Sequence, residues 1–357
     1  MAGARARSGA GRVGIGLAGL GRMGRVHAAN LASRCSVAGL VCVYDADPAV
    51  AQEVASSSGV PAAPSFEALL GFPGLDAVAI AAPTAAHAGM CVLAATAGRP
   101  VFCEKPVSLD RGATLDALAA VEAAGVPFQV GFHRRFDPDW AAAARRIRAG
   151  ELGDVYLFRT SLRDMAPPPA GFLARSGGFF VDVTIHDLDT ARWIVGEVEA
   201  VTAHGTAASG EPFTSLGDID TAVVVLRFEG GALGVIDNSR VAGYGYECST
   251  EVMGRLATVR IDHPQVRHYE WLTPGRAEHD LPRDFGQRYP EAYAAELDGF
   301  ARSVRDGTPP LVTGWDALAA FDLARAADLS WRSGRTVPVE PQRTLSGVVY
   351  RVPDSER

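Results

Sequence analysis

The sequence predicts two domains: an α/β domain with a doubly wound parallel sheet, then an α+β domain built on a largely antiparallel open sheet. The chain has 357 residues, more than one hydrophobic core usually organises. Up to about residue 130, short β-branched runs alternate with longer helical patterns, as in βαβ units. Beyond Asp137, strand patterns follow one another with few helices between them, which favours an antiparallel sheet with one covered face.

The first domain is expected over residues 13–136, after a disordered tail over residues 1–12. Glycines that follow Ala-rich stretches mark the ends of its helices. These glycines are Gly59, Gly98 and Gly125. The predicted strands are Val13 to Leu17, Ser36 to Tyr44, Ala77 to Ala81, Val101 to Cys103 and Pro127 to Gly131.

The second domain is expected over residues 137–340, with a C-terminal tail over residues 341–357. A helix over Trp140 to Arg148 leads into it, and Glu229-Gly230-Gly231 predicts a hairpin turn. The spacing of apolar residues predicts two late helices, Glu291 to Arg305 and Trp315 to Arg332, the second with an N-cap near Thr313. Both helices are candidates to pack back on the first domain. The predicted strands are Gly153 to Arg163, Val198 to Ala207, Ile219 to Phe228, Leu233 to Val241, Glu247 to Met253 and Ala257 to Ile261.

Composition narrows the class of protein. Apolar residues make up 48% of the chain and charged residues 21%, which is enough for a packed core. A net charge of −7 argues against a nucleic-acid surface, which would need a stripe of cations. Five scattered cysteines without CxxC spacing favour buried thiols in a reducing compartment. Glycines interrupt the apolar stretch near the N-terminus, so we expect neither a signal peptide nor a membrane span there. We expect a cytoplasmic protein with a small-molecule partner, no nucleic acid and no membrane.

A glycine motif predicts the cofactor. Gly19-Leu20-Gly21-Arg22-Met23-Gly24 follows the first strand and opens a helical pattern, where a pyrophosphate would meet unpaired backbone N–H groups. By itself such a motif could be a tight turn in a glycine-rich chain. Asp45, however, lies about 20 residues beyond the last glycine, as an acid that binds a ribose 2′-hydroxyl should. Together these features predict a dinucleotide-binding Rossmann domain.

Asp45 and Asp47 are both candidates for that acid. Asp47 precedes Pro48 at a helix start, so it is more simply an N-cap. Asp45 therefore remains for the ribose. Its carboxylate would repel a 2′-phosphate, and no arginine follows at once, so we expect NAD rather than NADP.

Two further features suggest catalysis. Lys105, in Glu104-Lys105-Pro106, follows a strand at the sheet edge where open α/β proteins bind ligands, although it could equally be an exposed loop lysine. Asp182 and His186 lie four residues apart, on one face of a helix, and could also form a purely structural contact. No third ligand at suitable spacing accompanies them, so we expect no metal.

In this order, these motifs resemble the Gfo/Idh/MocA oxidoreductase family over nearly the whole chain. The resemblance is greatest to inositol 2-dehydrogenases. It rests on Phe102 to Pro106, Gln129 to Phe132, Arg134 to Asp137, Asp182 to Asp187 and Tyr244-Gly245-Tyr246. It implies a catalytic role for Lys105, Asp182 and His186. The imidazole would be the base near neutral pH, Lys105 would stabilise the developing alkoxide, and Asp182 would orient the substrate or the imidazole. A cis Lys105-Pro106 bond is a secondary expectation.

The resemblance also implies the residues that bind cofactor and substrate. The expected cofactor-binding residues are Gly19, Gly21, Arg22, Met23, Gly24, Asp45, Pro83, Thr84, Glu104 and Lys105. The expected substrate-binding residues are Lys105, His133, Arg134, Arg163, Asp164, Asp182, His186, Tyr244 and Tyr246. Alternatives stay open for several of them. Arg163 and Asp164 could form a surface ion pair, Tyr244 could be a core aromatic, Thr84 could cap a helix and His87 could point to solvent.

The expected reaction is NAD-dependent oxidation of a ring hydroxyl of a cyclic polyol, first of all myo-inositol to scyllo-inosose. A reductase of an inosose or modified sugar, and an NAD-dependent glycoside hydrolase, are the alternatives. His133 stands where inositol dehydrogenases often have methionine, and this residue and Met165 bear on which polyol is bound. An apolar outer face over Leu233 to Val241 would suit a homotetramer or dimer.

Overall fold

The computed structural model describes residues 11–262 and 270–353, which form two compact units. Unit 1 comprises the described residues up to Glu104, with Leu115–Gln129 and Tyr293–Leu311. Unit 2 comprises Lys105–Thr114 and the described residues of 130–292 and 312–353. The expected N-terminal tail, residues 1–12, lies mostly outside the described residues.

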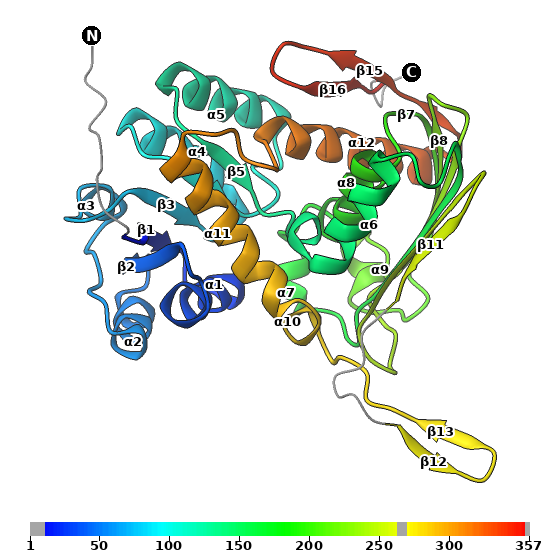
Figure 1. Cartoon of the computed structure of the whole chain (residues 1–357), viewed down its shortest axis with the longest axis horizontal. Coiled ribbons are helices and arrows are strands. Elements are labelled where there is room, and N and C mark those ends of the chain that lie inside the picture. The colour runs from blue at the N-terminus through cyan, green and yellow to red at the C-terminus, as the bar shows by residue number, and fades with distance from the viewer. Residues whose placement is uncertain (1–10, 263–269, 354–357) are drawn as a thin grey trace. The chain divides into compact units, whose positions relative to one another are not determined.

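Unit 1 is built on a five-stranded parallel sheet with the strand order β2-β1-β3-β4-β5. Its strands are β1 (Val13–Ala18), β2 (Ala38–Tyr44), β3 (Ala77–Ile80), β4 (Val101–Cys103) and β5 (Phe128–Val130). Its helices are α1 (Arg22–Ser33), α2 (Pro48–Ser58), α3 (Phe66–Leu70), α4 (Thr84–Thr96), α5 (Arg111–Ala124) and most of α11 (Pro290–Asp306). Helices α1 and α2 lie on one side of the sheet and α4 and α5 on the other (Figure 1). This is the predicted doubly wound arrangement.

The core of unit 1 includes residues from a distant part of the chain. Strands β1 and β3 are buried along their whole length, as expected for a parallel sheet covered on both faces. Leu297, Phe300 and Ala301 of α11 belong to the same apolar cluster as Ile15 and Leu17 of β1. Helix α11 therefore completes the core of the first unit, as one of the two late helices was expected to do.

Unit 2 is built on a seven-stranded sheet with the order β11-β10-β6-β9-β8-β7-β14. Its strands are β6 (Val155–Arg163), β7 (Val198–Thr206), β8 (Thr221–Phe228), β9 (Leu233–Ser239), β10 (Glu247–Gly254), β11 (Thr258–Ile261) and β14 (Val337–Pro338). All neighbouring pairs are antiparallel except β6 and β9, which run parallel. The carboxyl ends of β6 and β9 therefore meet at one edge of the sheet.

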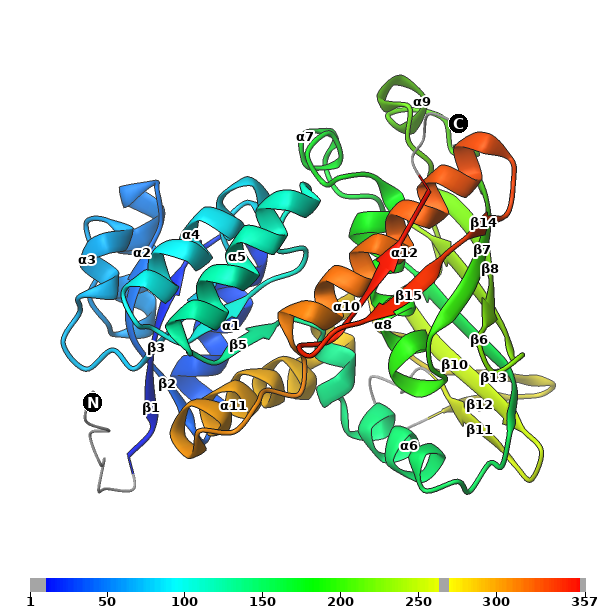
Figure 2. The same cartoon turned by 90° about the horizontal axis from the view of Figure 1, so that it is seen from above.

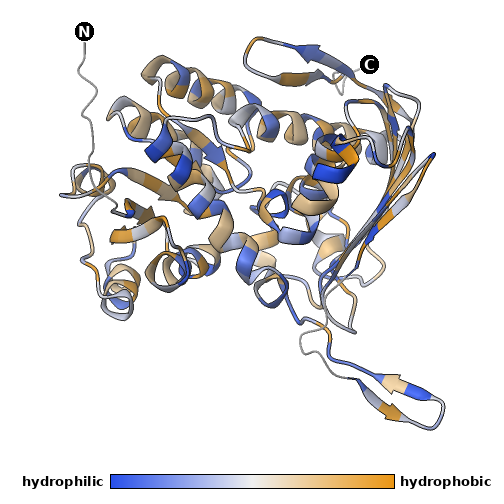
Figure 3. Ribbon diagram, in the orientation of Figure 1, coloured by the Kyte–Doolittle hydropathy of each residue, from blue (hydrophilic) through white to orange (hydrophobic). Residues whose placement is uncertain are grey.

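Helices cover one face of this sheet and leave the other open. The elements on or beside it are η1 (His133–Phe136, 3₁₀), α6 (Pro138–Arg148), α7 (Ala170–Leu173), η2 (Phe180–Thr184, a π-helix), α8 (Ile185–Ile194), α9 (Phe213–Leu216), α10 (Phe285–Arg288) and α12 (Gly314–Ser333). Figure 2 shows α6, α8 and α12 along the covered face. Buried and less buried residues alternate along β6, β8 and β10, as a half-covered sheet requires, and both hydrophilic and hydrophobic residues occur in this sheet (Figure 3).

Most predicted bounds agree with the structure to within a few residues. Thr313 caps α12 through a capping box with Asp316, and a tight turn with Gly231 in a left-handed conformation joins β8 to β9. The sequence did not predict the hairpin of β12 (Trp271–Thr273) and β13 (Arg276–Glu278). Part of the expected C-terminal tail forms the paired strands β15 (Glu340–Arg343) and β16 (Val348–Arg351). Within the described residues, no helix is both long and apolar enough to span a membrane.

Candidate active site

The glycine motif forms a tight loop between β1 and α1. Gly19 has φ +88°, and a Cβ atom there would lie 2.2 Å from the backbone nitrogen of Ala82. A Cβ on Gly24 would lie 1.9 Å from the carbonyl oxygen of Gly19, so α1 can approach the loop only without a side chain there. Gly21 precedes α1 without any side-chain cap, which leaves the first N–H groups of the helix for an anion. The loop therefore fits the pyrophosphate of a dinucleotide.

Asp45 is tied to this loop. Its carboxylate accepts hydrogen bonds from the backbone N–H groups of Leu20 (2.7 Å) and Asp47 (2.9 Å). Asp47 caps α2 by accepting from the N–H of Ala49, with Pro48 at the first helical position, as predicted. Asp45 remains partly exposed. Its position beside the loop is compatible with the expected contact to a ribose.

The structure of the loop after β3 excludes two alternatives that the sequence left open. Pro83, which is exposed, is the N-cap of α4, and Thr84 is the first helical residue, so Thr84 does not cap the helix through its hydroxyl. His87 is buried rather than pointing to solvent, with its Nε2 2.6 Å from the carbonyl oxygen of Ala82. Arg22 and Met23 form the start of α1, with Arg22 exposed and Met23 partly buried.

In unit 2, an ion-paired cluster surrounds Asp182. The Lys105 Nζ donates to the backbone oxygen of Asp182 (2.8 Å) and lies 3.2 Å from its Oδ1. Arg240 Nη2 donates to Asp182 Oδ2 at 2.7 Å. Lys105 is the single lysine among the 34 lysine and arginine residues of the chain. Its peptide bond to Pro106 is cis, as expected.

The π-helical backbone of η2 explains why the side chains of Asp182 and His186 do not contact each other. In a π-helix each turn takes in more residues than in an α-helix, so residues four apart do not lie directly above one another. Asp182 lies in this π-turn, and His186 lies in α8 just after it. The purely structural Asp182–His186 contact, which was the alternative interpretation, is not among the hydrogen bonds of the described residues. His186 Nδ1 is buried and makes no hydrogen bond with a residue that the structure describes.

Burial and the nearby cations act against each other on the pKa of Asp182 and in the same direction on the pKa of His186. Burial alone would raise the pKa of Asp182, but Lys105 and Arg240 outweigh it and hold that pKa below its ordinary value. Burial lowers the pKa of His186 well below that of an ordinary histidine, and the charge of Lys105 lowers it further. The site thus holds a carboxylate anion beside a neutral imidazole, which can accept a proton.

A row of aromatic rings leads to His186. The ring of His133 lies 5.2 Å from that of His186 and 4.6 Å from that of Tyr289, measured between centroids. Tyr289 in turn lies 6.3 Å from Tyr246. Two of the expected substrate residues, His133 and Tyr246, are therefore brought into one buried row with the candidate base. Sequence reasoning missed Tyr289, which no motif marks.

Arg134 has a buried ionic partner. Its Nη1 donates to Asp187 Oδ1 at 2.5 Å, and Asp187 also accepts from Thr160 (3.2 Å) and Asn238 (3.0 Å). These bonds connect η1 and α8 to strands β6 and β9. Asp187 follows His186 directly, so this network fixes the start of α8 on the sheet.

Arg163 and Tyr244 are not brought to the cluster. Arg163 lies on the open face of the sheet and forms an ion pair with Asp237 rather than with Asp164. Tyr244 is exposed, and its hydroxyl donates a hydrogen bond to Glu247. Tyr244 is therefore not a core aromatic. Asp164, which follows β6, is partly buried.

Arg240 is a further candidate residue that sequence reasoning overlooked. It is buried and follows the end of β9, as Arg163 ends β6. Because β6 and β9 are parallel, both strands end at the same edge of the sheet. A parallel pair was not predicted here, so nothing in the sequence pointed to Arg240.

Comparison with known proteins identifies the family of both parts of the chain. Residues 13–132 match the model of the oxidoreductase family with an NAD-binding Rossmann fold, and residues 144–339 match the C-terminal alpha/beta domain of the same family. The chain is 38% identical to scyllo-inositol 2-dehydrogenase (NAD(+)) of Bacillus subtilis, over 92% of this chain and 97% of that protein.

Two solved structures are similar over most of their length. The myo-inositol dehydrogenase of Corynebacterium glutamicum has a TM-score of 0.87 at 34% identity, covering 93% of this chain and 100% of that one. The scyllo-inositol dehydrogenase of Lactobacillus casei, solved with NAD(H) and scyllo-inositol, has a TM-score of 0.84 at 28% identity and covers 92% and 99%. With both family domains matched in order, the chain belongs to the Gfo/Idh/MocA family of NAD-binding oxidoreductases.

Proposed function

We propose that the protein oxidises a ring hydroxyl of an inositol with NAD, first of all myo-inositol to scyllo-inosose. The observation that carries this proposal is a lysine amine held by Asp182, whose charge acts on the partly buried His186 and, after burial, lowers the pKa of that imidazole. The similar proteins named above act on inositols. No contact in either unit favours the reductase or the glycoside hydrolase over this reaction.

Each of the three side chains has a separate task. His186 accepts the hydroxyl proton, because its imidazole stays neutral near pH 7. Lys105 donates a hydrogen bond to the same oxygen and stabilises the developing negative charge. Asp182 keeps the amine oriented through two contacts and balances its positive charge, while Arg240 holds the other oxygen of the same carboxylate. NAD, bound at Gly19 to Gly24 and Asp45, supplies the hydride acceptor.

Of the remaining candidates, His133 and Tyr246 are best placed to select the polyol, because they lie in the row of rings that ends at His186. Roles for Arg134, Arg163, Asp164 and Tyr244 in binding the substrate remain predictions. We also infer a reducing compartment, the cytoplasm, because all five cysteines are buried free thiols.

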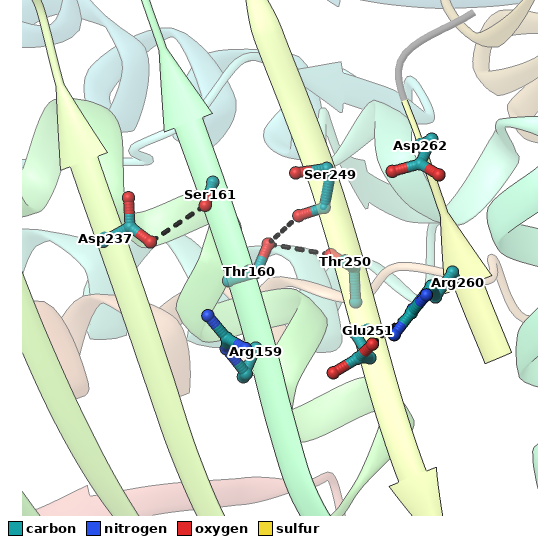
Figure 4. A pocket seen from close by; sticks show the side chains of 9 residues that line it. All are labelled: Arg159, Thr160, Ser161, Asp237, Ser249, Thr250, Glu251, Arg260 and Asp262. Carbon is teal, nitrogen blue, oxygen red and sulfur yellow. Dashed lines mark hydrogen bonds and ion pairs between the residues drawn. The ribbon is translucent and has the colours of Figure 1, made fainter. Parts of the chain in front are cut away.

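We further propose that the open face of the unit 2 sheet pairs with a second copy of the chain. Val223, Val225, Leu233 and Met253 expose 39–49% of their surface on this face. Beside them lies a polar hollow of about 160 Å³ lined by residues of β6, β9, β10 and β11 (Figure 4). Such an apolar patch with polar surroundings is typical of a protein interface.

Replacing Lys105 or His186 should abolish the chemical step. We expect Lys105→Met, Lys105→Arg and His186→Ala to lower kcat by about 10²- to 10⁴-fold. Arginine should not rescue the lysine, since a planar guanidinium cannot take the place of a compact amine. NADH formation with a panel of inositols, inososes and hexoses measures this, with exposed His279→Ala as the control. Losses confined to KM would contradict the assigned roles.

The acid limb of the pH profile should lie below the range of an ordinary histidine. Protonation removes the base, and the pKa of His186 is lowered by burial and by Lys105. We therefore expect kcat/KM for oxidation to stay constant from about pH 8 down to about pH 6.5 and to fall only below that. An acid limb that begins above neutral pH would argue against His186 as the base.

Cofactor choice should depend on Asp45. The wild type should favour NAD over NADP, because the carboxylate repels a 2′-phosphate. Asp45→Ala should narrow this preference by about tenfold, about 1.4 kcal/mol in transition-state binding. Asp47→Ala, two residues away, removes only the helix cap and should leave the NAD/NADP ratio of kcat/KM unchanged. Comparable turnover of the wild type with both cofactors would overturn the assignment.

Self-association should depend on the apolar patch. We expect sedimentation velocity to show an oligomer for the wild type and a smaller species for Leu233→Asp, because a buried unpaired carboxylate opposes association. Leu272→Asp places the same charge on the exposed β12–β13 hairpin and serves as the control. A wild type that sediments as a monomer would refute the proposal.

A further inference from the structure

A second group of titratable side chains lies inside unit 1, and the proposed reaction does not use it. His27 of α1, Glu104 after β4 and Glu296 of α11 bring a nitrogen and two carboxylate oxygens within 4.8 Å of one another. Their exposed fractions are 0%, 8% and 0%. Three segments far apart in the sequence thus converge on one buried polar cluster.

The contacts in this cluster are unequal. His27 Nε2 lies 2.7 Å from Glu104 Oε1, a hydrogen bond in which the imidazole N–H donates. Neither carboxylate oxygen of Glu296 forms a hydrogen bond with any residue in the described parts of the chain. The ring of His27 packs edge-on against Phe102 and Tyr293, so aromatic side chains border the cluster.

An ionised Glu296 would be costly here. A buried carboxylate without hydrogen bonds gains a proton rather than remain charged. Two carboxylates that share one site also do not both ionise, and one of them has a strongly raised pKa. Burial raises the pKa of Glu296 well above its ordinary value, and the charge of Glu104 raises it further. The nearby thiol of Cys35 has a pKa raised to about 12, mainly by burial, and so adds no charge.

A metal ion explains the contacts less well than a proton does. Two ligands of one tetrahedral zinc ion lie about 3.3 Å apart, whereas His27 and Glu104 are 2.7 Å apart. A ligating histidine normally donates its other N–H to a partner. His27 Nδ1 is buried and has no such partner among the residues described.

We propose that His27, Glu104 and Glu296 share one buried proton, carried by Glu296 as a neutral acid, and that this proton holds Glu104 in place ahead of Lys105. The Glu104 carboxylate accepts from His27 Nε2 and lies within 4.8 Å of the Glu296 oxygen that would carry the proton, while the backbone N–H of Glu104 donates to the backbone oxygen of Ile80 of β3 at 2.9 Å. Lys105 follows Glu104 directly in the chain. Glu104 is therefore a positioning residue for the catalytic amine.

Infrared spectroscopy detects the proton directly. At neutral pH the wild type should show the C=O stretch of a buried carboxylic acid, shifted in D₂O and lost in Glu296→Gln. Glu291→Gln, an exposed position on the same helix, should keep the band. Absence of any such difference would refute the neutral acid. Stoichiometric metal in the purified protein, lost in Glu296→Gln, would replace the proton with an ion.

The pH dependence of stability provides a second measure. Above about pH 4.3 the unfolded chain releases this proton while the folded chain keeps it. The Glu296 carboxyl therefore lowers stability as the pH rises. Its contribution increases the equilibrium constant for unfolding about tenfold for each pH unit, until Glu296 ionises in the folded state. Denaturant unfolding of Glu296→Gln should lose this part of the slope, and Glu291→Gln should retain it. Equal slopes in all three proteins would contradict the proposal.

The positioning role of Glu104 is tested by an NMR signal of Lys105 and by enzyme kinetics. Only the kinetic test rests on the proposed function. Because Lys105 is the single lysine, lysine labelled with ¹³C at Cε gives one resonance. We expect Glu104→Gln to shift it and Glu291→Gln to leave it in place. In turnover, Glu104→Gln should lower kcat about tenfold or more, with KM for NAD unchanged. A raised KM for NAD with constant kcat would make Glu104 a cofactor ligand instead, and an unmoved resonance would exclude positioning.

Discussion

The Asp182 carboxylate, held between Lys105 and Arg240, is the interaction on which the rest of the candidate site depends. It supplies a counterion at contact distance to an amine and a guanidinium that little water reaches, as largely buried cations require. Burial, and after it the charge of Lys105, lowers the pKa of His186 well below its ordinary value and keeps the imidazole neutral. The site therefore holds a carboxylate anion paired with two cations and, apart from it, a neutral imidazole that can accept a proton near neutral pH.

Local features were the part of the fold that the sequence predicted well. The glycine loop, Asp45 and the Asp47 cap depend on residues near one another in the chain, and turn or cap geometry restricts each of them strongly. The capping box at Thr313 is of the same kind. Strand bounds were close because apolar runs end at turn residues. Such signals need no knowledge of the tertiary structure.

Features that depend on strand neighbours were not predicted. Arg240 reaches Asp182 because β9 runs parallel to β6, and nothing in the sequence of either strand specifies that partner. The resemblance suggested Arg163 as a substrate ligand, yet its side chain lies on the open face, one position along from Leu162 on the covered face. In a strand, a single residue separates the two faces. The π-turn that separates Asp182 from His186 was equally beyond a pattern that assumes α-helical spacing.

Lys105 is the single lysine of the chain, and all its other lysine or arginine positions are arginine. This has a practical consequence. Reagents that acylate or alkylate side-chain amines have one target in this protein, and it is the residue at the centre of the Asp182 cluster. Attachment of an amine-reactive support or dye to this side chain would therefore disrupt the contacts between Lys105 and Asp182. Substrate or cofactor that shields Lys105 would slow this labelling, so the extent of modification would itself report on occupancy.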